Sequence, residues 1–252
     1  RLAAAAGTAH QISVLVSDVP ENKLDALASG PTMPDTSTLQ DCYDIVHRYN
    51  LLPQFPPSVR DLFEHQRLTE TPKAGDAAFL NARYLTVLSN ATAVNAVIEH
   101  TALKGFAVEV DNTCDDWDYA DAAEYLLRRL RELRRGVSRV CLISGGEVTV
   151  KVTGKSGKGG RNQQFALECA RKIAGENITI LSAGTDGIDG NSPAAGAIVD
   201  GTTMKRLRTH GLDASAALAS FDAYPLFETL GDAIMTGYTG NNVRDLRILF
   251  AY

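Results

Sequence analysis

Residues 154–164 read G-K-S-G-K-G-G-R-N-Q-Q and lie between two hydrophobic patterns of different period. Before them, Val148, Val150 and Val152 alternate with polar residues, which is the period-two pattern of a half-buried strand. After them, the apolar residues between 165 and 173 are spaced as on one face of a helix. The sequence therefore predicts a glycine-rich loop that joins a strand at 148–152 to the N terminus of a helix.

This loop is rich in positive charge and has no acidic residue between Glu147 and Glu168; the cations are Lys151, Lys155, Lys158 and Arg161. A helix N terminus already carries unpaired N–H groups and partial positive charge, so a cation there is unfavourable unless an anion is near. Gly159 and Gly160 allow close approach of the backbone, and Arg161 offers a planar fork for oxyanions. We interpret the loop as a phosphate or carboxylate cradle, with a solvated basic loop as the alternative.

The bulk properties exclude several classes of protein. The chain has 252 residues, 44% hydrophobic and 22% charged, with a net charge of −5, so it can form one large or two modest soluble domains. The negative net charge argues against nucleic-acid and anionic-membrane partners, and no apolar run is long enough to cross a membrane. Four widely separated cysteines argue against a zinc site or a disulfide scaffold and suit a reducing, cytoplasmic setting.

Regular alternation of strand and helix patterns predicts an α/β fold. A buried strand is expected at 12–16, and the polar stretch 69–76 reads as a connector. From residue 84, strands at 84–88, 106–110 and 140–143 alternate with helical patterns, which predicts a largely parallel sheet. The chain has no initiator Met, and we expect it to begin inside a larger protein.

Acidic residues follow two of the predicted strands. Asp186 and Asp189, each followed by glycine, come after a strand at 178–181, and Asp18 follows the strand at 12–16. Carboxylates at strand ends are suited to Mg²⁺ or to a sugar hydroxyl, although Asp-Gly pairs also serve as ordinary turns and Asp18 could cap one. Glu147 could bind a hydroxyl or a metal, or form an ion pair with Arg161.

Seven motifs in one order carry a resemblance: S-D-V at 17–19, A-S-G-P-T at 28–32, S-G-G-E at 144–147, G-G-R-N-Q at 159–163, S-A-G-T-D-G-I-D-G at 182–190, A-A-G-A-I-V-D at 194–200 and T-G-x-T-G-x-N-V at 236–243. Together they resemble the glycerate 2-kinase family, whose C-terminal part is called the MOFRL domain. The resemblance spans nearly the whole chain.

The resemblance implies ATP- and Mg²⁺-dependent phosphorylation of D-glycerate at its 2-hydroxyl, giving 2-phosphoglycerate, in a cleft between two α/β domains. Residues 1–80 would be the last part of a Rossmann-like N-terminal domain, and residues 81–252 a MOFRL-type domain with a mixed sheet. Nucleic acid and membrane are not expected as partners, and a homodimer is left open.

The resemblance and the residue patterns together assign the candidate site. Arg161 and Asp18 are the expected catalytic residues, and Asp186 and Asp189 are the expected Mg²⁺ ligands. The substrate- or nucleotide-binding candidates are Ser144, Gly145, Gly146, Glu147, Lys155, Lys158, Gly159, Gly160, Asn162, Gln163, Thr185, Asp186 and Asn242.

The chain departs from the family pattern in several places. Four residues differ from the family pattern: Gln164, Tyr238, Asn241 and Arg244 stand where glutamate, proline, threonine and asparagine are usual. Arg244 adds a charge near a third glycine-rich loop, at residues 236–242. The family's N-terminal lysine and glycine-rich helix entry have no counterpart, which puts autonomous activity in doubt. Two alternatives stay open: a hydroxypyruvate reductase, for which we find no G-x-G-x-x-G fingerprint, and a non-catalytic fragment that binds an anionic metabolite.

Overall fold

The computed structural model describes residues 1–20 and 22–252 in full, together with the backbone of Glu21. The chain divides into two compact units, one formed by Arg1–Leu15 and Val19–Val87 and the other by Val16–Asp18 and Leu88–Tyr252. The domain boundary expected between residues 80 and 81 stays a prediction.

The first unit contains a two-stranded sheet, order β1-β2, and short helices; the elements are α1 (Leu2–Ala5), β1 (Gln11–Val16), η1 (Glu21–Ser29), α2 (Leu39–Arg48), η2 (Leu52–Gln54), α3 (Pro57–Glu64), η3 (Ala77–Phe79) and β2 (Ala82–Leu88). The predicted strand at 12–16 is present, but Ile12 and Val14 are 71% and 64% exposed, so its predicted burial is wrong. A strand in a two-stranded sheet has too few neighbours to bury both of its faces.

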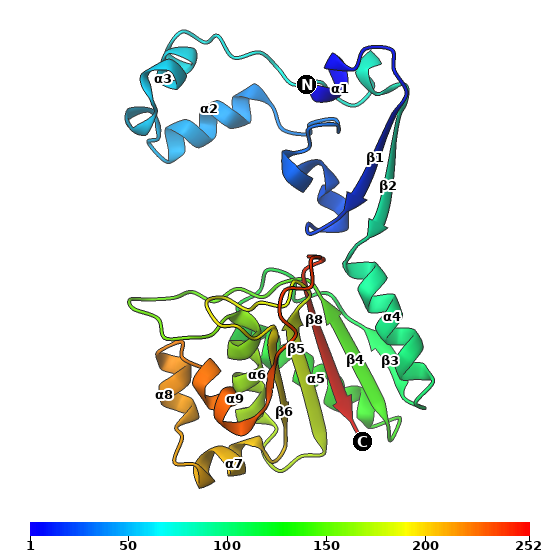
Figure 1. Cartoon of the computed structure of the whole chain (residues 1–252), viewed down its shortest axis with the longest axis vertical. Helices are drawn as coiled ribbons and strands as arrows, with labels where there is room; N and C mark the ends of the chain where they lie inside the picture. The colour runs from blue at the N-terminus through cyan, green and yellow to red at the C-terminus, as the bar shows by residue number, and fades with distance from the viewer. The chain divides into compact units, whose positions relative to one another are not determined.

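The second unit is built on a six-stranded sheet (Figure 1). Its elements are α4 (Asn90–Ala102), β3 (Ala107–Val110), α5 (Tyr119–Arg134), β4 (Val140–Gly145), α6 (Arg161–Lys172), β5 (Ile178–Gly184), β6 (Gly196–Asp200), α7 (Thr203–Thr209), α8 (Ala214–Ala219), α9 (Tyr224–Leu230), β7 (Ala233–Ile234) and β8 (Asp245–Ala251). The strand order is β3-β4-β8-β5-β6-β7.

This sheet is mixed, which confirms the α/β class and the mixed sheet implied by the resemblance. The prediction of a largely parallel sheet is wrong, because β3 and β4 are parallel whereas the other neighbouring pairs are antiparallel. The last strand of the chain, β8, lies between β4 and β5 and runs opposite to both. The predicted strand at 84–88 belongs to β2 and pairs with β1 instead.

Helices cover both faces of the six-stranded sheet. α4 packs on β3, β4 and β8 through a small cluster that includes Val94, Cys141 and Ile143. α5 and α6 lie on the opposite face and build the larger core with β5, β6 and β8, where Phe165 and Leu249 are fully buried. Alternate residues of β8 therefore face two different cores.

The predicted strand at 148–152 is wrong. Residues 147–149 instead run beside the start of α5, where Thr149 N donates to Trp117 O at 2.7 Å and Tyr119 N donates to Thr149 O at 3.0 Å. These bonds satisfy the backbone outside the sheet and leave one isolated bridge, between Asp118 and Thr149. The predicted helix after the glycine-rich loop is confirmed as α6.

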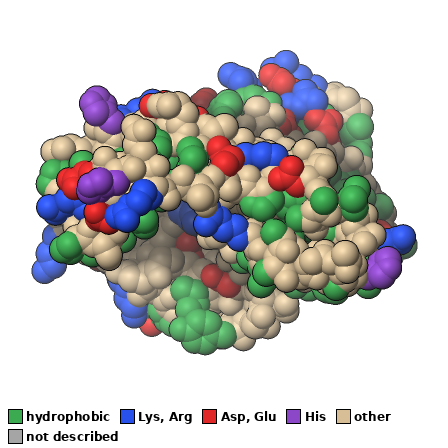
Figure 2. Space-filling model, turned by 90° about the horizontal axis from the view of Figure 1, so that it is seen from above, with side chains coloured by type: hydrophobic (Ala, Val, Ile, Leu, Met, Phe, Trp, Pro, Cys, Tyr) green, Lys and Arg blue, Asp and Glu red, His purple; other side chains and the backbone are tan. Residues whose placement is uncertain are grey.

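Charges on the surface are mixed. On the face shown in Figure 2, lysine and arginine side chains lie beside aspartate and glutamate in small groups. In the part of the chain that the structure describes, no helix is long and apolar enough to cross a membrane.

Candidate functional site

Two loops of the second unit are in direct contact: the basic loop, at residues 154–164, and the acidic loop, at residues 185–191 after β5. Asn191 N donates to Gly159 O at 3.1 Å, and Gly159 N donates to Asn191 Oδ1 at 2.8 Å. Gly190 has a φ of +63°, and a Cβ there would lie 2.2 Å from Gly159 O. Only glycine allows these two backbones to approach so closely. The two glycine-rich loops predicted from the sequence thus form one structure.

The N terminus of α6 is capped by Asp189, whose side chain comes from the acidic loop. Asp189 Oδ1 accepts from Asn162 N at 3.0 Å and from Asn162 Nδ2 at 3.3 Å, while Oδ2 accepts from Gln163 N and Gln163 Nε2, both at 2.9 Å. Gly160 makes room, since a Cβ there would lie 2.4 Å from Asp189. The helix terminus read from the sequence as an anion site is therefore filled by the chain's own carboxylate.

Asn162 and Gln163 are buried and support this cap. Ser182 Oγ donates to Asn162 Oδ1 at 2.7 Å, and Gln163 Nε2 also donates to Ser192 Oγ at 2.7 Å. Burial raises the pKa of Asp189, although the hydrogen bonds from Asn162 and Gln163 lower it. Both amides are thus committed inside the protein, and their predicted role as ligand contacts is untested.

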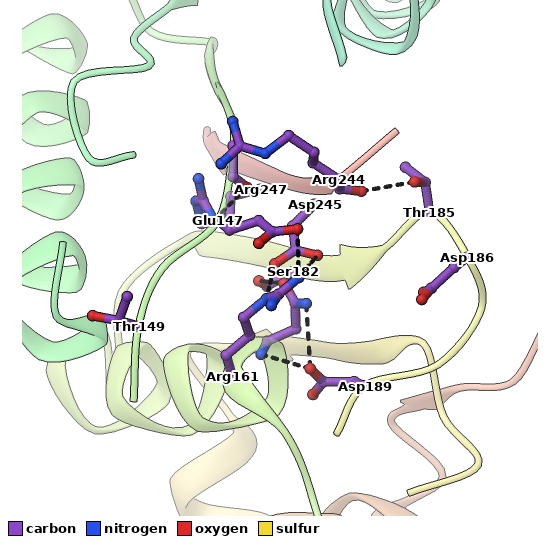
Figure 3. A network of polar contacts seen from close by, with 12 residues as sticks. Glu147, Thr149, Arg161, Ser182, Thr185, Asp186, Asp189, Arg244, Asp245 and Arg247 are labelled. Carbon is purple, nitrogen blue, oxygen red and sulfur yellow. Dashed lines mark hydrogen bonds and ion pairs between the residues drawn. The ribbon is translucent and has the colours of Figure 1, made fainter. Parts of the chain in front are cut away.

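Arg161 is the first residue of α6 and joins two carboxylates. Its Nε donates to Asp245 Oδ2 at 2.6 Å, and its Nη2 lies 3.1 Å from Asp245 Oδ1 and 2.8 Å from Glu147 Oε1. Figure 3 shows the Arg161 and Asp245 side chains pointing toward each other. Burial lowers the pKa of Arg161, but the hydrogen bond and charge of Asp245, together with the charges of Glu147 and Asp189, outweigh burial, so the pKa lies above its ordinary value.

Glu147 is half-buried beside Arg161. Burial raises the pKa of Glu147, and the charge of Arg161 opposes that rise without cancelling it. The ion pair that the sequence offered as one role of Glu147 is present, and its other role, binding a ligand, remains a proposal.

The raised pKa of Glu147 predicts a pH dependence of stability. Between its ordinary pKa of 4.5 and the higher value in the fold, the unfolded chain loses the Glu147 proton first. The folded state then holds more protons, so the free energy of unfolding falls as pH rises through that window. We expect Glu147→Gln to remove this fall. Urea unfolding of both proteins from about pH 4 to about pH 8 measures it, and a difference between them that is constant with pH would contradict it.

The S-G-G-E motif is packed against the protein's own side chains. A Cβ at Gly145 would lie 1.8 Å from Asn90 Oδ1, and one at Gly146, whose φ is +92°, would lie 2.7 Å from Asp115 Oδ1. Ser144 is fully buried on β4. Both glycines are thus explained by close packing inside the unit, and their predicted ligand contacts are untested.

The third glycine-rich loop is tied to the acidic loop through Thr185. Its Oγ1 donates to Arg244 O at 2.7 Å and accepts from Val243 N at 2.8 Å. Asn242 is exposed, and its Oδ1 accepts from Arg244 N at 2.9 Å. The turn at residues 242–244 therefore fixes Thr185, the residue that precedes Asp186 in the acidic loop.

Arg244 reaches across to the segment before α5. Its Nη1 and Nη2 donate to the two oxygens of Asp115 at 2.7 and 2.6 Å, and its φ is +72°. Asparagine, usual at this position in the family pattern, tolerates that left-handed backbone better than arginine does. The added charge is therefore paired within the fold.

Two adjoining pockets of the second unit share Val150, Arg161 and Gly190. We name the first the acidic pocket; it has a volume of about 510 Å³ and is lined by Asp116, Glu147, Val148, Thr149, Val150, Arg161, Asp186, Ile188, Asp189 and Gly190. We name the second the apolar pocket; it has a volume of about 260 Å³ and is lined by Val150, Val152, Ser156, Gly157, Gly159, Gly160, Arg161, Gln164, Gly190, Asn191 and Phe221. Arg161 thus stands where the two pockets meet.

The remaining predicted residues lie outside the centre of this network. Lys155 is exposed, and the Lys158 ammonium lies 4.5 Å from the ring centre of Tyr224. Asp18 is exposed just after β1, and among the described residues it is not one that lines either pocket. Their predicted roles are neither supported nor contradicted by these positions.

Asp186 and Asp189 differ as metal ligands. Asp186 Oδ1 accepts from Ile188 N at 3.1 Å, which leaves Oδ2 for a ligand, whereas each oxygen of Asp189 already accepts two hydrogen bonds. Among the described residues, no group of three or more His, Cys, Asp or Glu is arranged to hold a metal ion. A magnesium ion would therefore need oxygens from its substrate, as Mg²⁺ commonly does.

Sequence reasoning missed three residues of this network. Asp245, whose side chain is 2% exposed, and Asp115 pair with arginines, and Arg247 is fully buried below them. Arg247 Nη2 donates to Gly145 O at 2.9 Å, and burial lowers its pKa. Asp245 immediately precedes the apolar, strand-like run at residues 246–250, and that position at a strand end was the available signal.

The fold and site define an α/β protein of the MOFRL class. The model described as "MOFRL family" matches residues 140–245, and the one described as "Domain of unknown function (DUF4147)" matches residues 1–64. The chain belongs to the MOFRL/DUF4147 glycerate kinase family, as its similarity to individual proteins also shows.

Three of these similarities are informative. Glycerate 2-kinase of Pyrococcus horikoshii is 35% identical over 94% of this chain and 55% of its own length. The crystal structure of glycerate kinase from Thermotoga maritima has a TM-score of 0.85 at 33% identity, covering 100% of this chain and 59% of that one. A protein of Agrobacterium vitis with the provisional name hydroxypyruvate reductase is 33% identical over 98% of this chain and 56% of its own length. The chain thus spans about half the length of these curated relatives.

Proposed function

We propose that this chain takes part in the ATP- and Mg²⁺-dependent transfer of a phosphoryl group to the 2-hydroxyl of D-glycerate, giving 2-phosphoglycerate. The observation that carries the proposal is Arg161, held by Asp245 and Glu147 where the two pockets meet. Family membership supports the reaction class, and the arrangement at Arg161 supports a site for a charged phosphoryl group.

Arg161 stabilises the negative charge that the phosphoryl oxygens carry in the transition state. Among the described residues, Nη1 is the guanidinium nitrogen without a partner, because Nε and Nη2 are bonded to Asp245 and Glu147. A fixed cation needs no reorganisation during the reaction, which is the basis of electrostatic catalysis in phosphoryl transfer.

A divalent cation is needed to balance the acidic pocket. Four carboxylates and a single arginine line this pocket, so a polyphosphate would meet excess negative charge there; the carboxylates are Asp116, Glu147, Asp186 and Asp189. Asp186 is the carboxylate whose free oxygen suits Mg²⁺, which would neutralise and orient the phosphates. Asp189 serves instead to fix the start of α6, and with it Arg161.

Asp18 and the two lysines keep their proposed roles. Asp18 would orient or accept the proton of the acceptor hydroxyl, and Lys155 and Lys158 would attract the nucleotide phosphates. Because the chain spans about half the length of its relatives, we propose that the rest of the relatives' length contributes further groups to the reaction.

The test is an assay of the chain with D-glycerate, ATP and Mg²⁺. We expect ADP release that depends on glycerate, and a product that enolase consumes directly, which separates 2-phosphoglycerate from its 3-isomer. Thermal-shift measurements with ATP–Mg²⁺ and with glycerate run beside it. Binding of both without turnover would identify a binding fragment, and neither binding nor turnover would overturn the proposal for this chain.

The provisional name of the Agrobacterium vitis relative favours a second candidate, reduction of hydroxypyruvate. This reaction requires a nicotinamide pocket. We expect no oxidation of NADH by hydroxypyruvate. The absorbance of the nicotinamide band measures this oxidation. Oxidation at a rate above that of phosphoryl transfer would replace the kinase proposal.

A further inference from the structure

We propose that the apolar pocket binds the adenine ring of the phosphoryl donor, with Phe221 and Gln164 as the residues that recognise it. The inference rests on the proposed function, because it takes the donor to be a nucleoside triphosphate. It assigns to that donor a base site separate from the acidic pocket where its phosphates would react.

Phe221 occupies an unusual backbone position beside this pocket. After α8, Phe221 N donates to Leu218 O at 3.3 Å and Asp222 N donates to Ala217 O at 2.9 Å, and Phe221 has a φ of +53°. This pair of bonds is the Schellman motif, in which glycine commonly takes the left-handed position. A bulky residue there costs free energy. The strain suggests that the ring, rather than the turn, is what the position requires.

The pocket has apolar walls that suit a flat ring. Its apolar lining comes from Phe221, Val150 and Val152, and its volume of about 260 Å³ is small for a whole nucleotide. Nucleobases stack on aromatic side chains whatever their identity, because each base has a π-face. The aromatic ring and the two valines thus supply affinity for a base, and a polar group is needed to select one.

Gln164 supplies that polar group. It is 2% exposed and lines the pocket, and its Nε2 donates to Leu218 O at 2.8 Å. One of the two amide hydrogens is committed to Leu218, and the carbonyl oxygen, which no hydrogen bond among the described residues uses, is available to a ligand as an acceptor. The exocyclic amino group of adenine donates, whereas guanine has an acceptor oxygen at the same position. The pocket therefore favours adenine over guanine.

The glycine-rich loop connects this base site to Arg161. Gly157 N donates to Ser220 O at 2.9 Å, and Lys158 N donates to Asp222 Oδ1 at 2.7 Å. The loop is thereby seated on the segment that carries Phe221. Since Arg161 lines both pockets, a nucleotide with its base at Phe221 would direct its phosphates past Arg161 into the acidic pocket.

Phe221→Gly tests the base site without the usual risk of misfolding. Glycine removes the ring but suits the left-handed backbone, so thermal unfolding should occur at the same or a higher temperature. Calorimetric titration with adenosine and with ADP–Mg²⁺ should show binding weakened about tenfold or more. Gln66→Gly is the matched control: it has a φ of +50° in the same motif after α3, with Gln66 N donating to Phe63 O and Arg67 N to Leu62 O. It should leave nucleotide binding unchanged.

Base selection is tested by comparing ADP with GDP. Wild-type chain should prefer ADP by about tenfold or more, and Gln164→Leu, which removes the acceptor, should reduce that preference even where overall affinity is also lost. Equal affinity for ADP and GDP, no binding of adenosine to the wild-type chain, or unchanged affinity in Phe221→Gly would each overturn the base site. Phosphorylation of glycerate with unimpaired ATP use by Phe221→Gly would overturn it while leaving the kinase proposal intact. Nucleotide binding that depends on Phe221, without turnover of glycerate, would support the base site and overturn the kinase proposal for this chain.

Discussion

Replacing Arg161 by alanine is expected to lower the rate of phosphoryl transfer to glycerate by about 10²–10³-fold, because a fixed cation that stabilises developing charge is lost. The same change leaves two carboxylates without their partner. Asp245 is 2% exposed in its side chain, whereas Arg161 is 38% exposed. Removing one member of a buried ion pair costs about 3–5 kcal/mol. Because Arg161 is partly exposed, we expect the free energy of unfolding to fall by about 2–3 kcal/mol. Turnover is measured by ADP release and stability by urea unfolding.

A matched pair of variants separates the two effects of Arg161. In Arg161→Ala/Asp245→Asn both charges are removed, so much of the stability should return while turnover stays low. Arg161→Lys keeps the positive charge but cannot bond both oxygens of Asp245. Its turnover and its stability should therefore lie between those of wild type and Arg161→Ala. Turnover of Arg161→Ala within about twofold of wild type would refute the catalytic role.

Replacing Asp189 by alanine is expected to be among the most destabilising changes in the second unit. Four N–H donors of Asn162 and Gln163 lose their acceptor, two of them on the first turn of α6. Each unsatisfied buried donor costs about 1–3 kcal/mol. Structural relaxation offsets part of this cost, and so does the removal of a buried carboxylate. We therefore expect the free energy of unfolding to fall by about 3 kcal/mol or more. Chemical unfolding measures it.

Controls distinguish this cap from a metal site. Gly160→Ala should destabilise the protein in the same way, because its Cβ would lie 2.4 Å from Asp189. Asp186→Asn should alter the Mg²⁺ concentration needed for half-maximal activity with little loss of stability. If Asp189→Ala is as stable as wild type but requires more Mg²⁺, the original assignment of Asp189 as a metal ligand is correct and the cap is secondary.

Local patterns predicted part of the fold. The glycine-rich loop, α6, β4 and β5 follow from period and composition, which depend on short-range sequence. The position of β8 could not be predicted, because nothing local says that the last strand enters between β4 and β5. The strand expected at 148–152 failed for a related reason, since its valines face pockets beside α6 instead of a neighbouring strand.

The sequence predicted which residues form the candidate site better than it predicted the contacts among them. Sequence placed Arg161, Asp186, Asp189 and Glu147 in one region, and the structure brings them to the lining of one pocket. The sequence could not show that Asp189 caps α6, because the hydrogen bonds of this cap join Asp189 to Asn162 and Gln163, which are far from it in the chain. Alternation along β8 would have predicted an exposed Arg247, whereas the strand is central and covered on both sides.

The central place of β8 has a consequence for how the protein is made. Until the ribosome has released β8, β4 and β5 have no strand to join them, and Arg161 lacks its partner Asp245. Sheets completed by such distant segments form slowly and expose apolar edges meanwhile. The larger core can therefore close only after β8 has left the ribosome, and a truncation before Asp245 would leave that core open.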